Sequence, residues 1–251
     1  PREETSDTTV YVLEVNLRSS RTVPFLSKVT GIPMVNLATR VVLGKKLTEL
    51  GYGEGLWPKR KLVAVKAPVF SMSKLIGVDW YLGPEMKSTG EVMGIDYDFN
   101  SALLKALMAS NMTLVPNAAV LVSVADRDKY DAGKLVAKLL EAGCSIYATE
   151  GTASMINDMG EKVTLITKKL GQGYPNVVDV IREGIVSAVI NTVSDSAKTR
   201  RDGFYIRRAA AEQRIPCYTS LDTAHVAAES LLIGSEKFNV ESIDKYLNME
   251  S

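Results

Sequence analysis

The second half of the chain alternates short apolar runs with helical periodicity, and this alternation constrains the fold more than any other feature. The apolar runs have the length and composition of buried strands, and they cover residues 119–124, 145–148, 162–166, 186–190 and 215–218. The helical periods cover 130–142, 153–159, 177–183, 204–213 and 223–232. Strands and helices that alternate in this way form βαβ units. We therefore expect an α/β sandwich with a parallel sheet over residues 112–245.

The first half of the chain does not follow this pattern. It shows an early strand at 10–16 and one later strand at 61–67. Helical periodicity covers 24–28, 33–43 and 99–110. The early strand has no neighbour close in sequence, and a lone strand leaves its backbone hydrogen bonds unsatisfied. Pro116 and Asn117 mark a turn where the organisation changes. We expect residues 1–111 to be the end of a larger domain and residues 112–251 to be a second domain.

Composition argues against several classes of protein. The 251 residues include 30 Lys and Arg against 29 Asp and Glu, spread along the chain, so the electrostatic footprint of a nucleic-acid binder is missing. No apolar run reaches the roughly 20 residues of a membrane helix. Two cysteines and one histidine argue against a disulfide framework, a zinc site and a histidine-based triad. We expect a reduced cytoplasmic protein without a nucleic-acid or membrane partner.

Polar side chains gather where the predicted strands end. Four strands are followed by Thr149-Glu150-Gly151-Thr152, Thr167-Lys168-Lys169, Asn191-Thr192-Val193-Ser194 and Thr219-Ser220. The carboxyl ends of parallel strands share one edge, where helix N-termini bind ligands. Gly151 and Thr152 open a predicted helix and suit a phosphate, with Lys168 or Lys169 as the balancing charge. Helix capping explains any one of these residues, but together they indicate a small anionic ligand.

Other motifs favour binding over catalysis at this edge. The chain has no GxxxxGK[ST] motif and no GxGxxG motif after a predicted strand. Asp195 is the one carboxylate well placed at a strand end, so acid–base catalysis lacks its usual pair of groups.

The early strand carries a separate constellation of polar residues. Glu14, Asn16 and Arg18 fall on one face because side chains alternate along a strand. Two oxygen-bearing side chains beside a guanidinium suit Mg²⁺ that bridges nucleotide phosphates, and Arg21 follows closely enough to reach another phosphate oxygen. The alternative interpretation is an amphipathic strand whose polar face lies in solvent.

At these residues the sequence resembles the large chain of carbamoyl phosphate synthetase. YVLEVNLRSSRTVPFLSK at 11–28 is similar to the end of the family's second ATP-grasp domain, and LGPEMKSTGEVMG at 82–94 matches another signature stretch. Residues from 112 onward resemble its C-terminal allosteric domain. The resemblance implies a methylglyoxal-synthase-like, Rossmann-like α/β sandwich, preceded by the mostly helical tail of an ATP-grasp domain. It also implies a much larger parent protein, of which this chain is a cropped, cleaved or naturally split part.

The resemblance also implies roles for single residues. Glu14 and Asn16 match the family's metal ligands, and Arg18 and Arg21 match arginines of its catalytic nucleotide site. The positions that bind the nucleotide effector correspond to Lys129, Thr149, Thr152, Lys168 and Asn191. Lys129 is indicated by the resemblance alone.

Two departures from the family pattern concern the effector domain. Val193 stands where the family often has a second threonine, beside Thr192 on the same predicted strand end. Thr219 matches a position linked to ornithine in some members, but the surroundings of Val65 and Lys66 do not match. Ornithine is therefore not carried over to this chain.

The function implied by the resemblance is that of a ligase which makes carbamoyl phosphate from ATP, bicarbonate and glutamine-derived ammonia, for pyrimidine and arginine biosynthesis. This segment is expected to sense a nucleotide, UMP or else IMP, and to supply the last ligands for ATP and for Mg²⁺ or Mn²⁺. The expected partners are the rest of the large chain and a glutaminase small subunit, within an oligomer. Alone, the segment is expected to be inactive. Two alternatives remain, a free-standing lyase of the methylglyoxal synthase type and a non-catalytic nucleotide-sensing module.

Overall fold

The computed structural model of the chain describes residues 11–12, 15–16, 18–55, 57–58, 60–71, 79, 86–167, 173–193, 197–233 and 240–248. Contacts between residues divide the chain into two compact units, Pro1–Gly55 and Leu56–Ser251. The boundary expected between residues 111 and 112 remains a prediction. No helix in the described ranges is both long enough and apolar enough to cross a membrane.

The regular secondary structure described in the first unit is helical. Helix α1 spans Thr22–Thr30 and ends at Gly31, whose φ of 73° lies in the left-handed region that glycine adopts without strain. Helix α2 spans Met34–Val42 and starts directly after Pro33, and a short 3₁₀ helix, η1, covers Thr48–Leu50. The helical periodicity predicted at 24–28 and 33–43 is confirmed.

The strand predicted over residues 10–16 is wrong for the residues that are described. Tyr11, Val12, Val15 and Asn16 are exposed and lie outside any strand. The described part of this unit contains no second strand with which they could pair, and an unpaired strand loses its ladder of hydrogen bonds.

The second unit begins with an antiparallel pair of strands and a helix. Strand β1 (Val63–Val69) pairs with β2 (Gly90–Asp96), and helix α3 (Phe99–Ala109) packs on both. The strand predicted at 61–67 is thus confirmed, whereas β2 was missed because its glycines weaken the strand pattern. Gly94 is required by close packing, because a Cβ there would lie 1.9 Å from the carbonyl oxygen of Ala102 in α3.

The remainder of this unit is the expected α/β sandwich. Its five parallel strands are β3 (Ala119–Ser123), β4 (Ser145–Thr149), β5 (Thr164–Ile166), β6 (Ala188–Asn191) and β7 (Cys217–Tyr218), in the order β5-β4-β3-β6-β7. Its helices are α4 (Lys129–Glu141), α5 (Glu150–Asp158), α6 (Val177–Arg182), α7 (Ala197–Gln213) and α8 (Leu221–Ile233). The short 3₁₀ helix η3 (Asp126–Asp128) leads into α4. The α/β fold class and the parallel sheet are confirmed.

Alternate residues of each strand face opposite layers of helices, as the period of two requires. Val120 and Val122 of β3 belong to a hydrophobic cluster with α4, α5 and α8, whereas Leu121 between them belongs to a cluster with α6 and α7. Strands β3 and β6 are therefore buried on both faces, which explains why they are continuous apolar runs in the sequence.

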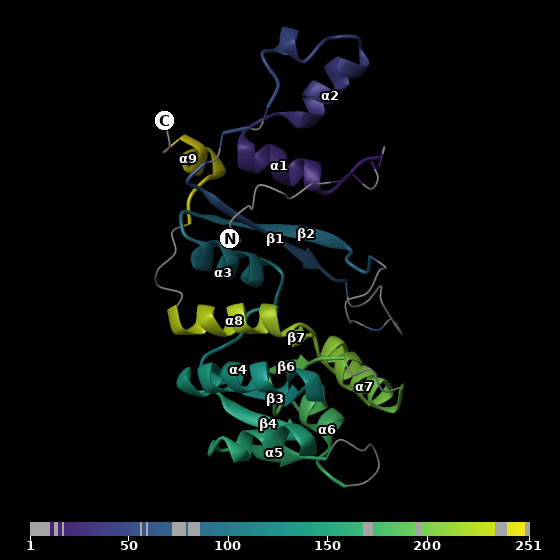
Figure 1. Ribbon diagram of the computed structural model, residues 1–251, viewed down its shortest axis with the longest axis vertical. Helices are drawn as coiled ribbons and strands as arrows, with labels where there is room; N and C mark the ends of the chain where they lie inside the picture. Colours follow the sequence, from purple (N-terminus) through teal and green to yellow (C-terminus); the bar gives the residue numbers. More distant parts are fainter. Residues whose placement is uncertain are drawn as a thin grey trace. The chain divides into compact units, whose positions relative to one another are not determined.

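Helix α8 links the sandwich to the strand pair and helix that precede it. It packs against α4 and also against α3, and Figure 1 shows it between the two. Leu107 of α3 lies in the same hydrophobic cluster as Leu135 of α4 and Ala227 of α8. The core thus runs without a break from α3 into the sandwich. A last helix, α9 (Ile243–Asn248), was not predicted.

Candidate functional site

The carboxyl ends of the strands bring most of the predicted polar residues together. The Thr149 hydroxyl at the end of β4 donates to the Ser123 hydroxyl at the end of β3 at 3.1 Å. The Asn191 side-chain amide at the end of β6 donates to the Ser123 carbonyl oxygen at 2.9 Å. All three residues are buried. Ser123, on the central strand, therefore joins the ends of its two neighbours, and we call this region the strand-end edge.

Two predicted ligand-binding threonines hold the segment that leaves β3. The Thr152 hydroxyl accepts a hydrogen bond from the Val124 backbone N–H at 3.2 Å, and the Thr192 hydroxyl accepts one from the Ala125 N–H at 2.8 Å. Both threonines are buried, at 1% and 8% exposure. Their hydroxyls thus fix the path of the chain from β3 into η3 and α4, a role that the sequence did not indicate.

The start of helix α5 is the part of the strand-end edge best suited to an anion. Thr149 is its N-cap residue in extended conformation, and it makes no side-chain capping bond. The first backbone N–H groups of a helix and the positive end of its dipole attract negative charge. The Lys129 Nζ lies 3.4 Å from the point that a Cβ on Gly151 would occupy, and 2.8 Å from Asp126 Oδ1. The structure thus places an ammonium group over the first turn of α5.

A groove of about 520 Å³ opens at the ends of β6 and β7. Its walls consist of Arg127, Asp128, Asp131, Thr192, Val193, Thr219, Ser220, Leu221 and Asp222. Arg127 donates to the Val193 carbonyl oxygen at 2.8 Å. The sequence predicted Thr192 and Thr219 but missed the three aspartates, because these follow the starts of helices rather than the ends of strands.

Arg207 of helix α7 is a second residue that the sequence did not single out. Its side chain is 1% exposed, and its guanidinium binds both carboxylate oxygens of Asp79 at 2.6 Å and the Asn191 Oδ1 at 2.6 Å. The one signal in the sequence is its position among apolar helix residues, such as Ile206 and Ala210, that are themselves buried. The predicted residue Asn191 is therefore bonded on both sides, to Ser123 and to Arg207.

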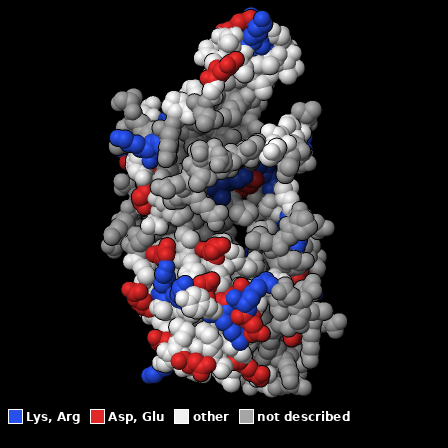
Figure 2. Space-filling model, viewed as in Figure 1, with Lys and Arg blue, Asp and Glu red and all other residues white. Residues whose placement is uncertain are grey.

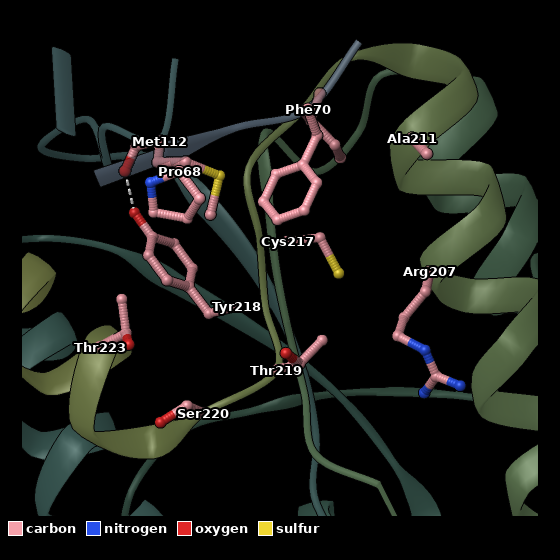
Figure 3. A pocket seen from close by; sticks show the side chains of 11 residues that line it. Pro68, Phe70, Met112, Arg207, Ala211, Cys217, Tyr218, Thr219, Ser220 and Thr223 are labelled. Carbon is pink, nitrogen blue, oxygen red and sulfur yellow. Dashed lines mark hydrogen bonds between the residues drawn. The ribbon is translucent and has the colours of Figure 1, made fainter. Parts of the chain in front are cut away.

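Arg207 also borders a small apolar pocket of about 170 Å³, which Figure 3 shows from close by. The pocket lies between Phe70 beyond β1 and Cys217 of β7, with Thr219 at one side. Burial raises the pKa of the Cys217 thiol to about 12, and the nearby Arg207 charge offsets this only in part. The thiol is therefore protonated at neutral pH.

Other predicted residues lie apart from this edge or outside the described residues. Glu14, Lys168, Lys169, Ser194 and Asp195 lie outside the described residues.

Asn16, Arg18 and Arg21 belong to the first unit. The Asn16 carbonyl oxygen accepts a bond from the Arg18 N–H at 3.0 Å, and Arg21 is the N-cap of α1. The predicted metal site stays a prediction, because Glu14 lies outside the described residues. The described ranges contain no group of three or more His, Cys, Asp or Glu residues that could hold a metal.

Surface charge is mixed on the face that Figure 2 shows, where Lys and Arg side chains intermingle with Asp and Glu around the five-stranded sheet. This agrees with the nearly equal numbers of the two charges in the sequence. An anion at the strand-end edge would therefore meet single cationic groups, such as Lys129, and not a broad positive surface.

Comparison with known protein families defines the class of this fold and site. Residues 131–219 match the MGS-like domain family, and residues 3–50 match the ATP binding domain of the carbamoyl-phosphate synthase L chain. The crystal structure of methylglyoxal synthase from Elizabethkingia anophelis NUHP1 is 17% identical, with a TM-score of 0.36, and the similarity covers 53% of this chain and 93% of that one. The two family matches thus place similarity to an ATP binding domain in the first part of the chain and similarity to an MGS-like domain in the second.

The carbamoyl phosphate synthase large chain of Thermomicrobium roseum is 53% identical to this chain over 242 residues. The match covers 96% of this chain and 22% of the relative. The resemblance inferred from the sequence is therefore confirmed. The chain is similar to this large chain over nearly its own whole length, and it spans about a fifth of the length of that relative.

Proposed function

We propose that this chain is the regulatory end of a carbamoyl phosphate synthase, and that its strand-end edge binds the phosphate of a nucleotide effector. The observation that carries the proposal is the Lys129 ammonium over the first turn of α5, 3.4 Å from the Cβ position of Gly151. A phosphate at this turn would meet backbone N–H groups, the helix dipole and a positive charge together. Lys168 is proposed as a second positive charge, as the family resemblance implies.

The absence of a side chain at Gly151 favours a phosphate at the first turn of α5. With glycine there, a phosphate oxygen can approach the backbone of the first turn as closely as the Lys129 amine already does. The groove next to Thr192 offers room for the rest of a nucleotide, because its 520 Å³ lies within the range of small-molecule sites, roughly 300–1,000 Å³. UMP is the effector that we propose first, with IMP as the alternative.

In the whole enzyme, the first unit is proposed to complete the site that phosphorylates carbamate. The match of residues 3–50 to an ATP-binding domain supports ATP as the nucleotide there. Asn16 and Glu14 are proposed to hold Mg²⁺ or Mn²⁺, which would neutralise phosphate charge, while Arg18 and Arg21 bind phosphate oxygens.

The proposed enzyme uses bicarbonate and glutamine-derived ammonia and serves pyrimidine and arginine biosynthesis. Its other parts would be the rest of the large chain and a glutaminase subunit. Because this chain spans 22% of its relative, we expect no ATP-dependent formation of carbamoyl phosphate by the purified chain.

Calorimetry on the 251-residue chain tests the effector site. UMP is expected to bind, and uridine, which lacks the phosphate, is expected not to bind. Lys129→Met should weaken UMP binding about tenfold or more, because a hydrogen bond to a charged group contributes about 1.5–3 kcal/mol. Lys134→Met is the matched control on the same helix, since the Lys134 side chain is exposed and pairs with Asp131 at 3.2 Å. Failure of both UMP and IMP to bind at millimolar concentration would refute the proposal.

A second candidate is a lyase that acts on a triose phosphate. It is favoured by the carboxylates of Asp128, Asp131 and Asp222 in the groove, which could supply the acid and base groups that such an elimination needs. Turnover of a triose phosphate by the purified chain would support the lyase, whereas UMP binding without turnover would support the regulatory function.

A further inference from the structure

A chain of hydrogen bonds leads from the strand-end edge to a residue between β1 and β2. It starts at the Ser123 carbonyl oxygen, continues through the Asn191 side chain and the Arg207 guanidinium, and ends at the Asp79 carboxylate. The four distances are 2.9, 2.6, 2.6 and 2.6 Å. Asp79 and Arg207 are 128 positions apart in the sequence. These hydrogen bonds therefore join two parts of the second unit that lie far apart in the sequence.

The Arg207 guanidinium is fixed by hydrogen bonds on two sides, to Asp79 and to Asn191. It meets Asp79 through two parallel bonds, a geometry that the planar fork of arginine matches and that lysine cannot reproduce. Arg207 is 1% exposed and Asn191 is 3% exposed, so water does not readily replace either partner. If Asn191 shifts, Arg207 must therefore move with it, because otherwise the buried Arg207 charge would lose a hydrogen bond.

Gly203 makes room for this contact one turn earlier in α7. A Cβ at residue 203 would lie 2.7 Å from the Arg207 Nη1 and 3.1 Å from the Asn191 Oδ1. Any side chain there would press on the two atoms that form the bond. The glycine thus permits the contact between the guanidinium and the last residue of β6.

We propose that Arg207 is a positioning residue that transmits the ligand state of the strand-end edge to Asp79. The inference rests on the proposed binding of a nucleotide at that edge. Asn191 and Thr192 are consecutive, and Thr192 holds the backbone after β3, so a ligand that shifts this edge also shifts the amide that Arg207 grips. The bidentate pair then carries the shift to Asp79.

A tryptophan next to Asp79 in the sequence provides the readout. The chain has two tryptophans, Trp57 and Trp80, so Trp57→Phe leaves Trp80 as the single reporter. Calorimetry measures UMP binding to this parent, and the emission of Trp80 is then recorded with and without saturating UMP. We expect UMP to change the emission of the parent.

Asp79→Asn should abolish the emission change while UMP still binds, because the amide cannot form the two charged bonds to Arg207. Arg207→Lys should act in the same way, since it keeps the charge but loses the fork. Arg208→Lys is the control on the neighbouring position, where the arginine is exposed and bonds Glu212 at 2.8 Å. It should leave both binding and the emission change intact.

Gly203→Ala is a third test variant, used in case loss of a charge prevents folding. It removes no charged group, and it should also abolish the emission change. Far-UV circular dichroism confirms that each variant is folded. If UMP binds to the parent without changing the emission, or if folded Asp79→Asn keeps the change, the role of Arg207 is refuted. If UMP does not bind to the parent, the same measurements are made with IMP, and failure of both nucleotides to bind instead overturns the proposed function, and this inference with it.

Discussion

Tyr246 in the last helix and Lys105 in α3 are joined by a hydrogen bond of 2.7 Å between the lysine Nζ and the tyrosine hydroxyl. The same Nζ lies 2.8 Å from Asp96 Oδ2 at the end of β2. Tyr246 is 2% exposed, although only five residues follow it in the sequence. The bond therefore fastens α9 to the strand pair and helix at the start of the second unit.

Tyr246→Phe should lower the free energy of unfolding by about 1.5–3 kcal/mol, the usual worth of a hydrogen bond to a charged group. The ring stays in place, so the loss reports the hydroxyl alone. Urea unfolding of the two proteins measures the difference. Tyr130→Phe is the control, since Tyr130 is 79% exposed, and it should change the stability by less than about 0.5 kcal/mol. Equal stability of Tyr246→Phe and the parent would contradict the bond.

Stability should also depend on pH through Lys105. Partial burial tends to lower the pKa of its ammonium, but the bonds with Asp96 and Tyr246 outweigh burial and raise the pKa above its ordinary value. A raised pKa means that the stabilisation is fully present below the ordinary lysine pKa of about 10.4, and is lost as the pH rises through the folded value. Unfolding curves from pH 8 to pH 12 should therefore show a smaller difference between the parent and Lys105→Met at the alkaline end.

Thr152→Val tests the bond that holds the chain after β3. The Val124 N–H would lose its acceptor in a partly buried position, which costs at most the roughly 1–3 kcal/mol of an unsatisfied buried donor. Thr152→Ser keeps the hydroxyl and loses one methyl group, worth about 0.8 kcal/mol. Thermal unfolding should thus rank the parent above the serine variant, and the serine variant above the valine variant. If valine is tolerated better than serine, the hydroxyl does not accept this bond.

Cys217 should resist alkylation although it borders a pocket. With a thiol pKa raised to about 12 by burial, about one thiol in ten thousand is ionised at pH 8. Iodoacetamide should therefore modify Cys217 about a thousandfold more slowly in the folded chain than in urea, where the thiol recovers its ordinary pKa. Mass spectrometry of digests taken over time measures both rates. Native and unfolded rates within about tenfold of each other would contradict the raised pKa.

The five-stranded sheet could be predicted because its inner strands β3 and β6 are buried on both faces and so appear as continuous apolar runs. Strand β2 could not, because Gly90 and Gly94 interrupt its pattern, and the reason for Gly94 lies in the backbone of α3. The predicted strand at 10–16 shows the opposite error. A pattern typical of a strand does not form one in the described residues of the first unit, because pairing depends on a neighbour.

The candidate site was predicted in part. The polar strand ends do meet, because parallel strands share one edge. Sequence patterns could not show that the hydroxyls of Thr152 and Thr192 bind backbone N–H groups, since those partners lie 28 and 67 positions away. The bond between Asp79 and Arg207 was missed for the same reason, because its partners come from segments that only the folded chain brings together.

The packing of Leu107 of α3 into the cluster around Leu135 and Ala227 has a consequence for how such a protein can be trimmed or recombined. A gene segment that begins at codon 112 would encode the whole sheet but would omit a side chain that fills its core. The inner face of α8 would then be left open to water. A join between residues 55 and 56 keeps that core intact, so it is the better crossover point for chimaeras and for shortened expression clones.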